Sequence, residues 1–527
     1  MASENETSIQ GGGDDAATDS STPSRPAQVI APPVGASAAR GFYWLTTLSL
    51  INKGVTTVSQ IVLFWYISRE DFGLLATSTT IATFIGIIQD AGLVPILVRR
   101  QRRFLLWCTP VFWLSLALAL ISATVLTGTG MITAHFLHHP ALAGLMAILS
   151  VRSLFAAPSA VPLAHLSKDM RFGLLAVYGF VGLVIERSLM ILFTCTWWRW
   201  GAYGLVIAMT IVTALRTVAL WSAAKTPIKW SPRFRRWPYV LRDSWLLSAA
   251  QLFQTIAGFG DNLLLALFRS QEVVGDYYWA FNLSMQTTIL LTTNLGGVLF
   301  PALSKLQREP ARMLRAFLRA AKLLSVVGIP CCFLQAAVAA PGVEILFGAK
   351  WRPGVPALEV LSVGMAMALL NYPALGLLRA QGRFRTERRL SAACAVMFLI
   401  AALIGAASGG ALSMAIAVSI YNAIAGTVYF LTATKGTLRQ FIVFYAPQLA
   451  LSAVCIGGAY IVTQMMVPTP NSSGLLWLQI GLTVSISAVS YAIAMRLLMR
   501  QVWDELMSHM VPIWRRMKRM IGMASTA

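Results

Sequence analysis

The sequence is poor in charge and has no alternating strand patterns. Only 12% of its 527 residues are charged, and 57% are hydrophobic. The apolar residues fall into repeated runs of roughly 20, a length that crosses the ~30 Å hydrocarbon core of a bilayer as a helix. Lipid offers no partner to a backbone N–H or C=O group, so such runs must be helical. The predicted class is an all-α membrane protein.

The sequence also lacks the motifs of an enzyme. It has no P-loop, no nucleophile elbow, no zincin helix and no carboxylate pair on one helical face. The six cysteines lie in or beside apolar runs without ligand spacing. His135, His138 and His139 cluster in a loop, but no acidic or cysteine partner is near them in sequence. We therefore expect no catalytic residue, no cofactor and no metal site.

The N-terminal forty residues have no apolar core, which excludes a cleavable signal in this stretch. They are rich in Ser, Thr, Gly, Ala and Pro, which predicts a disordered tail over residues 1–40. The first apolar run should therefore remain as the first helix.

Fourteen membrane-spanning helices are predicted in groups of six, six and two. An N-terminal lobe covers residues 41–221, a basic linker 222–242, a C-terminal lobe 243–431, a final pair 432–495, and a basic amphipathic tail 496–527. The expected spans are 41–66, 74–98, 104–127, 141–163, 172–196, 201–221, 243–268, 276–301, 322–341, 355–378, 390–408, 411–431, 441–464 and 475–495.

The net charge of +22 at first suggests a nucleic-acid partner. The basic residues, however, sit in short loops between apolar runs, which excludes that partner. Alternate connections and the two termini hold 33 of the 42 Lys and Arg residues, and the opposite connections hold five: Arg69, Arg199, Arg269, Lys350 and Arg352. Basic residues stay on the cytoplasmic side, so both termini should be cytoplasmic in an inner (plasma) membrane. The C-terminal tail should lie on anionic inner-leaflet lipids.

The first two groups of helices resemble copies of one unit. FWYISREDFG at 64–73 corresponds to LALFRSQEVVG at 265–275, and DAGLVPILVRR at 90–100 corresponds to NLGGVLFPALSK at 294–305. A unit of six helices cannot invert its orientation, so the repeat should be parallel, about an axis along the membrane normal.

Several charged residues fall inside the predicted spans, where each needs a partner, a cavity or a function. Lys53 shares one face of the first helix with Thr56 and Gln60. Asp90, on the second helix, lies at a depth where it could neutralise Lys53. Structural pairing and substrate contact both remain open for Lys53.

The remaining intramembrane polar residues divide unequally between the lobes. Cations predominate in the first lobe, whereas the second lobe has a single acid, Asp261, among several amide side chains. Arg216, in the first lobe, is expected only to extend its charged end to the lipid headgroups. A basic surface facing an amide-lined one suits an anionic, sugar-bearing amphiphile. The substrate-binding candidates are Lys53, Arg152, Arg187, Gln60, Gln254, Asn282 and Gln286, and the coupling or counter-ion candidates are Asp90, Asp261 and Glu186.

Six segments together resemble the polysaccharide transporters, or oligosaccharide flippases, of the multidrug/oligosaccharidyl-lipid/polysaccharide exporter superfamily. They are EDFGLLA (70–76), QDAGLVPILV (89–98), LSKDMRFGLLAVY (166–178), FGDNLLLALF (259–268), GDYYWAFNL (275–283) and ILFGAKWRPGVPALEVLSV (345–363). The resemblance implies two six-helix lobes in a V, alternating access, and a cationic central cavity for an undecaprenyl-pyrophosphate-linked oligosaccharide. It also implies glycan polymerase and export machinery as partners, and Asp261 matches an acid that the family commonly shows.

Two other functions stay open. A drug or metabolite exporter of the same superfamily would use acids such as Asp90 and Asp261 for ion coupling, and its cavity should be less basic. A membrane glycan polymerase or ligase would need a long external loop bearing catalytic Arg or His, whereas the external loops here are short.

Overall fold

The computed structural model describes most of the chain. The described residues are 51–99, 104–169, 171–195, 200–228, 230, 232–467, 473–500, 502–504 and 507. They belong to one compact unit, residues 49–527. The predicted tail 1–40, the start of the first predicted span and most of the tail 496–527 lie outside the described residues.

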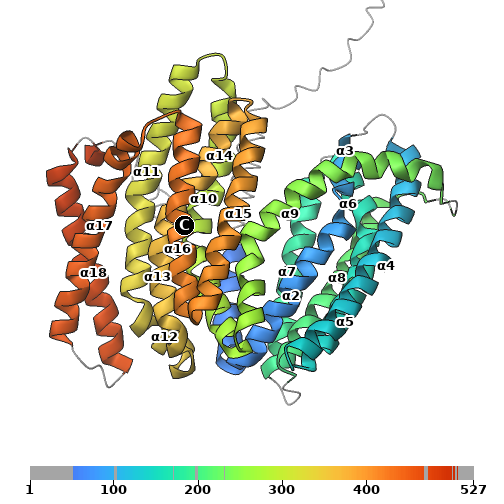
Figure 1. The fold of residues 1–527 in the computed structure, drawn as a ribbon, viewed down its shortest axis with the longest axis horizontal. Coiled ribbons are helices and arrows are strands. Elements are labelled where there is room, and N and C mark those ends of the chain that lie inside the picture. Colours follow the sequence, from blue (N-terminus) through green and yellow to red (C-terminus); the bar gives the residue numbers. More distant parts are fainter. Residues whose placement is uncertain are drawn as a thin grey trace, which may run out of the picture. The chain divides into compact units, whose positions relative to one another are not determined.

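The described part of the chain is built from helices and contains no strand (Figure 1). Residues 51–66 are helical. The α-helices that follow are α2 (Arg69–Asp90), α3 (Leu93–Arg99), α4 (Phe104–Phe136), α5 (Ala141–Ala156), α6 (Ala160–Lys168), α7 (Phe172–Cys195), α8 (Ala202–Ala224), α9 (Trp237–Phe268), α10 (Gln271–Lys305), α11 (Pro310–Ala337), α12 (Ala339–Phe347), α13 (Val355–Ala368), α14 (Asn371–Ala380), α15 (Phe384–Ser408), α16 (Ala411–Thr434), α17 (Leu438–Met466) and α18 (Ser473–Leu498). Short 3₁₀ turns are η2 (Ala157–Ser159), η3 (Phe234–Arg236) and η4 (Ala349–Gly354).

Eleven helical segments of the described chain are long and apolar enough to cross a membrane. The prediction of an all-helical, multi-pass membrane protein is confirmed. The predicted spans 243–268 and 276–301 coincide with α9 and α10, which are not among the eleven. Both helices carry many polar side chains, among them Asp261 on α9 and Asn282 on α10, and this lowers their hydropathy.

Some predicted spans are broken helices. The span 74–98 is split between α2 and α3, because Ala91 and Gly92 take left-handed φ values of 38° and 62°. The span 141–163 is split between α5 and α6 at η2, which contains Pro158. Proline and left-handed residues end the hydrogen-bond ladder of a helix, and the apolar pattern alone does not reveal such breaks.

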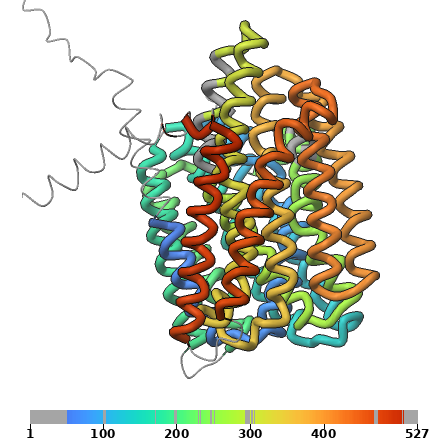
Figure 2. The backbone as a smooth tube through the Cα atoms, turned by 90° about the vertical axis from the view of Figure 1, so that its left-hand side faces the viewer, coloured from blue at the N-terminus to red at the C-terminus, as the bar shows by residue number. Residues whose placement is uncertain are grey.

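The helix contacts can be described in two sets, one before and one after residue 236. In the first set α5 lies against both α4 and α8, and α7 lies against α8. In the second set α13 lies against α10, α11 and α16. Helix α9 packs on α15 of the second set and on α2 of the first, and α17 packs on α11 and α18. Figure 2 shows α17 and α18, orange-red and red, running side by side in front of the other helices.

Helices α2 and α10, which start the corresponding segments of the two repeats, pack directly on each other. Ser68 caps α2, since its side chain accepts a hydrogen bond from the Asp71 backbone N–H at 2.9 Å. One turn further on, Gly73 of α2 and Gly275 of α10 bring the two backbones close together. The contact joins equivalent positions of the two halves, as a parallel repeat predicts.

Candidate functional site

A polar cavity of about 300 Å³ lies among α2, α4, α5 and α9. It contains two of the charged residues that the sequence singled out, Asp90 of α2 and Arg152 of α5. Hydroxyl and amide side chains make up most of its other polar lining: Thr79, Thr83, Gln89, Ser122, Ser153, Gln251 and Thr255. The cavity therefore combines one cation and one anion with many hydrogen-bonding groups.

Arg152 is held from the side of α8. Its Nε donates a hydrogen bond of 3.1 Å to Oγ1 of Thr213. The carboxylate of Glu186, on α7, is near enough to act on the guanidinium electrostatically. One edge of the Arg152 guanidinium is thus anchored within the protein, and the residue also lines the cavity. Arg152 can therefore bind an anion without breaking its bond to Thr213.

The expected ion pair between Lys53 and Asp90 is not seen among the described residues. Asp90 lines the cavity that Arg152 also lines, whereas Lys53 is half-buried on the helix of residues 51–66 and does not line it. Similar depth in the membrane placed the two residues together in the sequence-based interpretation. Depth alone leaves the azimuth of each helix undetermined, so it does not fix which side chains meet.

A second polar group joins the two halves near Tyr278 of α10. The Asn282 side chain donates a 2.7 Å hydrogen bond to the Tyr278 backbone carbonyl. Thr79, on α2, lies near the Tyr278 hydroxyl, and the charge of Arg187, on α7, acts on that hydroxyl. Arg187 donates only a long bond of 3.6 Å to Sδ of Met190, and its buried Nε has no hydrogen-bond partner among the described residues. A buried guanidinium nitrogen with an unused N–H favours an additional acceptor, such as a phosphate oxygen.

The amide candidates separate into two groups. Gln60 and Gln286 line a cavity of about 250 Å³ beside α11 and α12, together with Gln335. Gln335 is fixed there, because it donates to the Leu283 carbonyl at 2.8 Å and accepts from Thr287 at 2.6 Å. Gln254 is exposed on α9 and lines neither cavity.

Asp261 lies apart from both cavities. It is fully buried, and its Oδ2 accepts a 2.6 Å hydrogen bond from the hydroxyl of Tyr277. Its Oδ1 accepts from the backbone N–H of Asn262 at 2.8 Å and from the Asn262 side chain at 3.1 Å. Asp261 thus joins α9 to α10, and it pairs with no cation among the described residues.

The two halves are also joined where α2 and α10 begin. Nε of Arg69 donates to Oδ1 of Asp276 at 2.7 Å, and a second bond joins the same side chains. Glu272 lies 3.8 Å from the Arg69 guanidinium. The Asp276 side chain is only 4% exposed, so this ion pair is largely removed from solvent.

Residues of η4 extend this junction. Lys350 donates to the carbonyls of Trp65 and Ile67 at 2.8 and 2.7 Å, and the indole N–H of Trp351 donates to the Phe64 carbonyl at 3.1 Å. A lysine at a helix C-terminus satisfies carbonyls that have no partner within the helix. We call Arg69, Asp276, Lys350 and Trp351 the junction residues.

An aromatic cluster fills the space beneath the junction residues. The rings of Trp351 and Trp279 stack at 5.2 Å, and Phe64 meets the Trp351 ring edge-on at 5.3 Å. From the sequence, Arg69 and Lys350 stood out only for their charge, and the pair Arg69–Asp276 was not predicted. The motif GDYYWAFNL, which contains Asp276, Tyr278 and Trp279, was the signal that could have found this region.

Comparison with known proteins agrees with this geometry. The family profile described as "Polysaccharide biosynthesis protein" matches residues 62–356, more than half of the chain. This chain belongs to that family. The family resemblance in the sequence is confirmed, and the protein is a membrane transporter of polysaccharide biosynthesis of the Wzx type.

Two relatives illustrate the family. The lipopolysaccharide biosynthesis protein WzxC of Escherichia coli is 25% identical over 418 residues, which are 76% of this chain and 82% of WzxC. The succinoglycan biosynthesis transport protein ExoT of Rhizobium meliloti is 23% identical over 331 residues, 62% of this chain and 66% of ExoT. ExoT is described as a transport protein, and WzxC as a protein of lipopolysaccharide biosynthesis.

Solved structures show the same fold. The lipid II flippase MurJ in an inward closed conformation superposes with a TM-score of 0.71 at 14% identity, covering 87% of this chain and all of MurJ. An inward-facing multidrug transporter of the MATE family superposes with a TM-score of 0.56 at 17% identity, covering 75% of this chain and 95% of that one. The polysaccharide biosynthesis protein therefore has the fold shared by MurJ and MATE transporters.

Proposed function

We propose that this protein flips an undecaprenyl-pyrophosphate-linked oligosaccharide across the bacterial inner membrane by alternating access. The observation that carries the proposal is Arg152, an anchored guanidinium in a cavity that is also lined by Asp90, by hydroxyl and amide side chains and by small or apolar residues. A guanidinium binds phosphate through charge-assisted hydrogen bonds, and hydroxyls and amides suit sugar hydroxyl groups. The cavity would take the phosphate-bearing part of the cargo.

The names of related proteins support a lipid-linked cargo. MurJ is described as a lipid II flippase, and WzxC and ExoT are described as proteins of lipopolysaccharide and succinoglycan biosynthesis. A cargo with a lipid anchor and a charged glycan fits a polar cavity that opens within a bundle of apolar helices. The flipped product would be consumed by a glycan polymerase and export machinery.

The candidate residues take three roles in this proposal. Arg152, Arg187 and Lys53 contact the pyrophosphate in successive conformations, with Arg187 contributing its unused Nε. Asp90 and Glu186 balance the cations when the cavity is empty, and Asp261 is a candidate for ion coupling. The remaining hydrogen-bonding candidates for the sugars are Gln60, Gln254, Asn282 and Gln286.

The topology in the proposal has fourteen spans, in lobes 41–221 and 243–431 with a final pair in 432–495. The positive-inside rule places both termini, the linker 222–242 and the basic tail 496–527 in the cytoplasm. The junction residues would then lie on the external side. Their contacts support a conformation that is closed to the outside. These contacts would have to break before the cargo could be released.

The test is a strain without this gene, compared with the same strain after the gene is restored. We expect loss of surface polysaccharide and accumulation of complete lipid-linked units facing the cytoplasm. Flipped single units that fail to lengthen would identify a polymerase instead. Normal surface glycan with altered drug sensitivity would identify an exporter.

A further inference from the structure

The first turns of α11 carry a row of basic residues along one face. Arg312, Arg315, Arg319 and Lys322 follow one another at intervals of three or four residues, the spacing that places side chains on one side of a helix. The opposite face is apolar and fixed, because Phe317 and Ala321 are fully buried. The cations therefore point away from the protein core on a helix whose position is set by packing.

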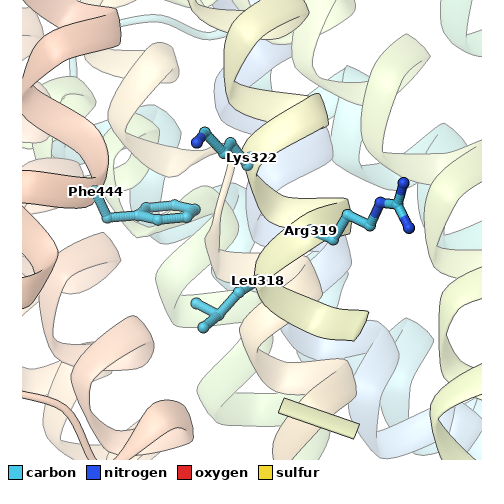
Figure 3. A pocket seen from close by; sticks show the side chains of 4 residues that line it. All are labelled: Leu318, Arg319, Lys322 and Phe444. Carbon is cyan, nitrogen blue, oxygen red and sulfur yellow. The ribbon is translucent and has the colours of Figure 1, made fainter. Parts of the chain in front are cut away.

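The end of this row faces helix α17. A cavity of about 670 Å³ lies between the two helices and is lined by Leu318, Arg319 and Lys322 of α11 and by Phe444 of α17. Figure 3 shows Lys322, Leu318 and Phe444 directed into the same space, while Arg319 points away from Phe444. The cavity thus has a cationic upper part and an apolar lower part.

Among the cations of this row that line the cavity, Lys322 is the one directed toward Phe444 (Figure 3). Glu309 pairs with Arg312 at 3.3 Å. Lys322 is half-buried and makes no ion pair among the described residues. It stands where the predicted span 322–341 begins, at the level of the cytoplasmic headgroups in the proposed topology. Phe444 lies just inside the predicted span 441–464, so both walls of the cavity lie near the start of a predicted span.

We propose that this cleft between α11 and α17 binds the phosphate group of a membrane lipid from the cytoplasmic leaflet. The Lys322 ammonium contacts the phosphate, and Leu318 and Phe444 contact the first carbons of the lipid chain. Lysine acts on phosphate as a point charge, and the apolar side chains beside it suit a lipid chain better than a free, hydrated anion. The site is separate from the Arg152 cavity, and the inference does not depend on what the protein transports.

The experiment is native mass spectrometry of the full-length protein purified in detergent and titrated with phosphatidylglycerol or phosphatidylcholine. Both lipids carry a phosphate, but only phosphatidylglycerol has a net negative charge. We expect tighter binding of phosphatidylglycerol, and Lys322→Ala should weaken that binding about five-fold, because a basic residue near an anionic lipid surface is worth about that factor. Lys322→Arg should retain the binding.

Arg439→Ala is the matched control. Arg439 is exposed at the start of α17, carries the same charge and does not line the cavity. If Lys322→Ala and Arg439→Ala lose phosphatidylglycerol binding equally, the lipid responds to general surface charge and the proposed site is wrong. Equal binding of the two lipids by the unchanged protein would also contradict the site. Displacement of the lipid by inorganic phosphate at equal concentration would identify a free-anion site instead. Lys322→Gln gives the same readout if Lys322→Ala does not fold.

Discussion

Gly73 and Gly275 form a reciprocal contact between the two halves of the protein. A Cβ atom on either glycine would lie 3.1 Å from the backbone nitrogen of the other. Each would also overlap a backbone carbonyl of the facing helix, that of Gln271 for Gly73 and that of Arg69 for Gly275. Gly73 corresponds to Gly275 in the sequence repeat, and Arg69 corresponds to Gln271. The contact is therefore two-fold symmetric, as between the subunits of a symmetric dimer.

Substitution of Gly73 should destabilise the protein by separating α2 from α10. We expect Gly73→Ala to cost about 1–3 kcal/mol, the usual cost of an extra carbon where packing leaves no space. The control is Gly86→Ala on the same helix, where nothing lies within 4 Å of the added carbon. The thermal unfolding midpoint of the purified protein measures both. Equal midpoints would show that α2 and α10 need not approach so closely.

The ion pair between Arg69 and Asp276 should contribute more to stability than an exposed pair. Asp276→Ala leaves a partly buried guanidinium without its partner, at an expected cost of about 3 kcal/mol. Glu309→Ala removes the exposed partner of Arg312 and should cost about 1 kcal/mol or less. The thermal unfolding midpoints of Asp276→Ala, of Glu309→Ala and of the double variant Arg69→Ala/Asp276→Ala measure these costs.

The same ion pair should hold the external side closed. In Asp276→Ala we expect a single cysteine introduced at Phe72, next to the aromatic cluster, to react faster with a membrane-impermeant thiol reagent. Phe72 packs edge-on against Trp351 at 5.9 Å and should be shielded while the junction residues are in contact. Unchanged labelling would mean that the aromatic contacts close this side without the ion pair.

Arg152 and Arg216 offer a matched test of the cavity. Both are arginines inside predicted spans, but only Arg152 lines the cavity, whereas Arg216 is exposed on α8. Arg152→Ala should reduce glycan export about ten-fold or more at normal protein levels, since a charge-assisted phosphate contact is worth about 1.5–3 kcal/mol. Arg216→Ala should leave export near normal. Equal export in both variants would contradict the role of Arg152.

Asp261 should be needed for packing through its bond to Tyr277. Asp261→Ala leaves the Tyr277 hydroxyl and an Asn262 amide unpaired in the interior, at an expected cost of about 1–3 kcal/mol. Asp261→Asn retains an acceptor and should recover much of this stability. If Asp261→Asn is stable but transport no longer depends on an ion gradient, the residue has a coupling role besides its structural one.

Much of the fold could be predicted from the sequence, because membrane-spanning helices leave a strong signal. Each predicted span from 74–98 onward lies, to within a residue at its ends, inside one helix or across two consecutive α-helices, since an apolar run of that length can satisfy its backbone in lipid only as a helix. The symmetric contact at Gly73 and Gly275 lies at positions that the sequence repeat had aligned. The breaks near Ala91 and Pro158 were missed because hydropathy does not register backbone dihedral angles.

The hydropathy pattern is enough to identify residues that are costly in a membrane, and it identified Arg152, Arg187 and Asp261. Which of these residues meet depends on how the helices pack. Asp90 shares a cavity with Arg152 instead of pairing with Lys53, and Asp261 is bound by Tyr277 away from both cavities. The physical reason is that hydropathy fixes the depth of a side chain, whereas its neighbours depend on the rotation and packing of whole helices.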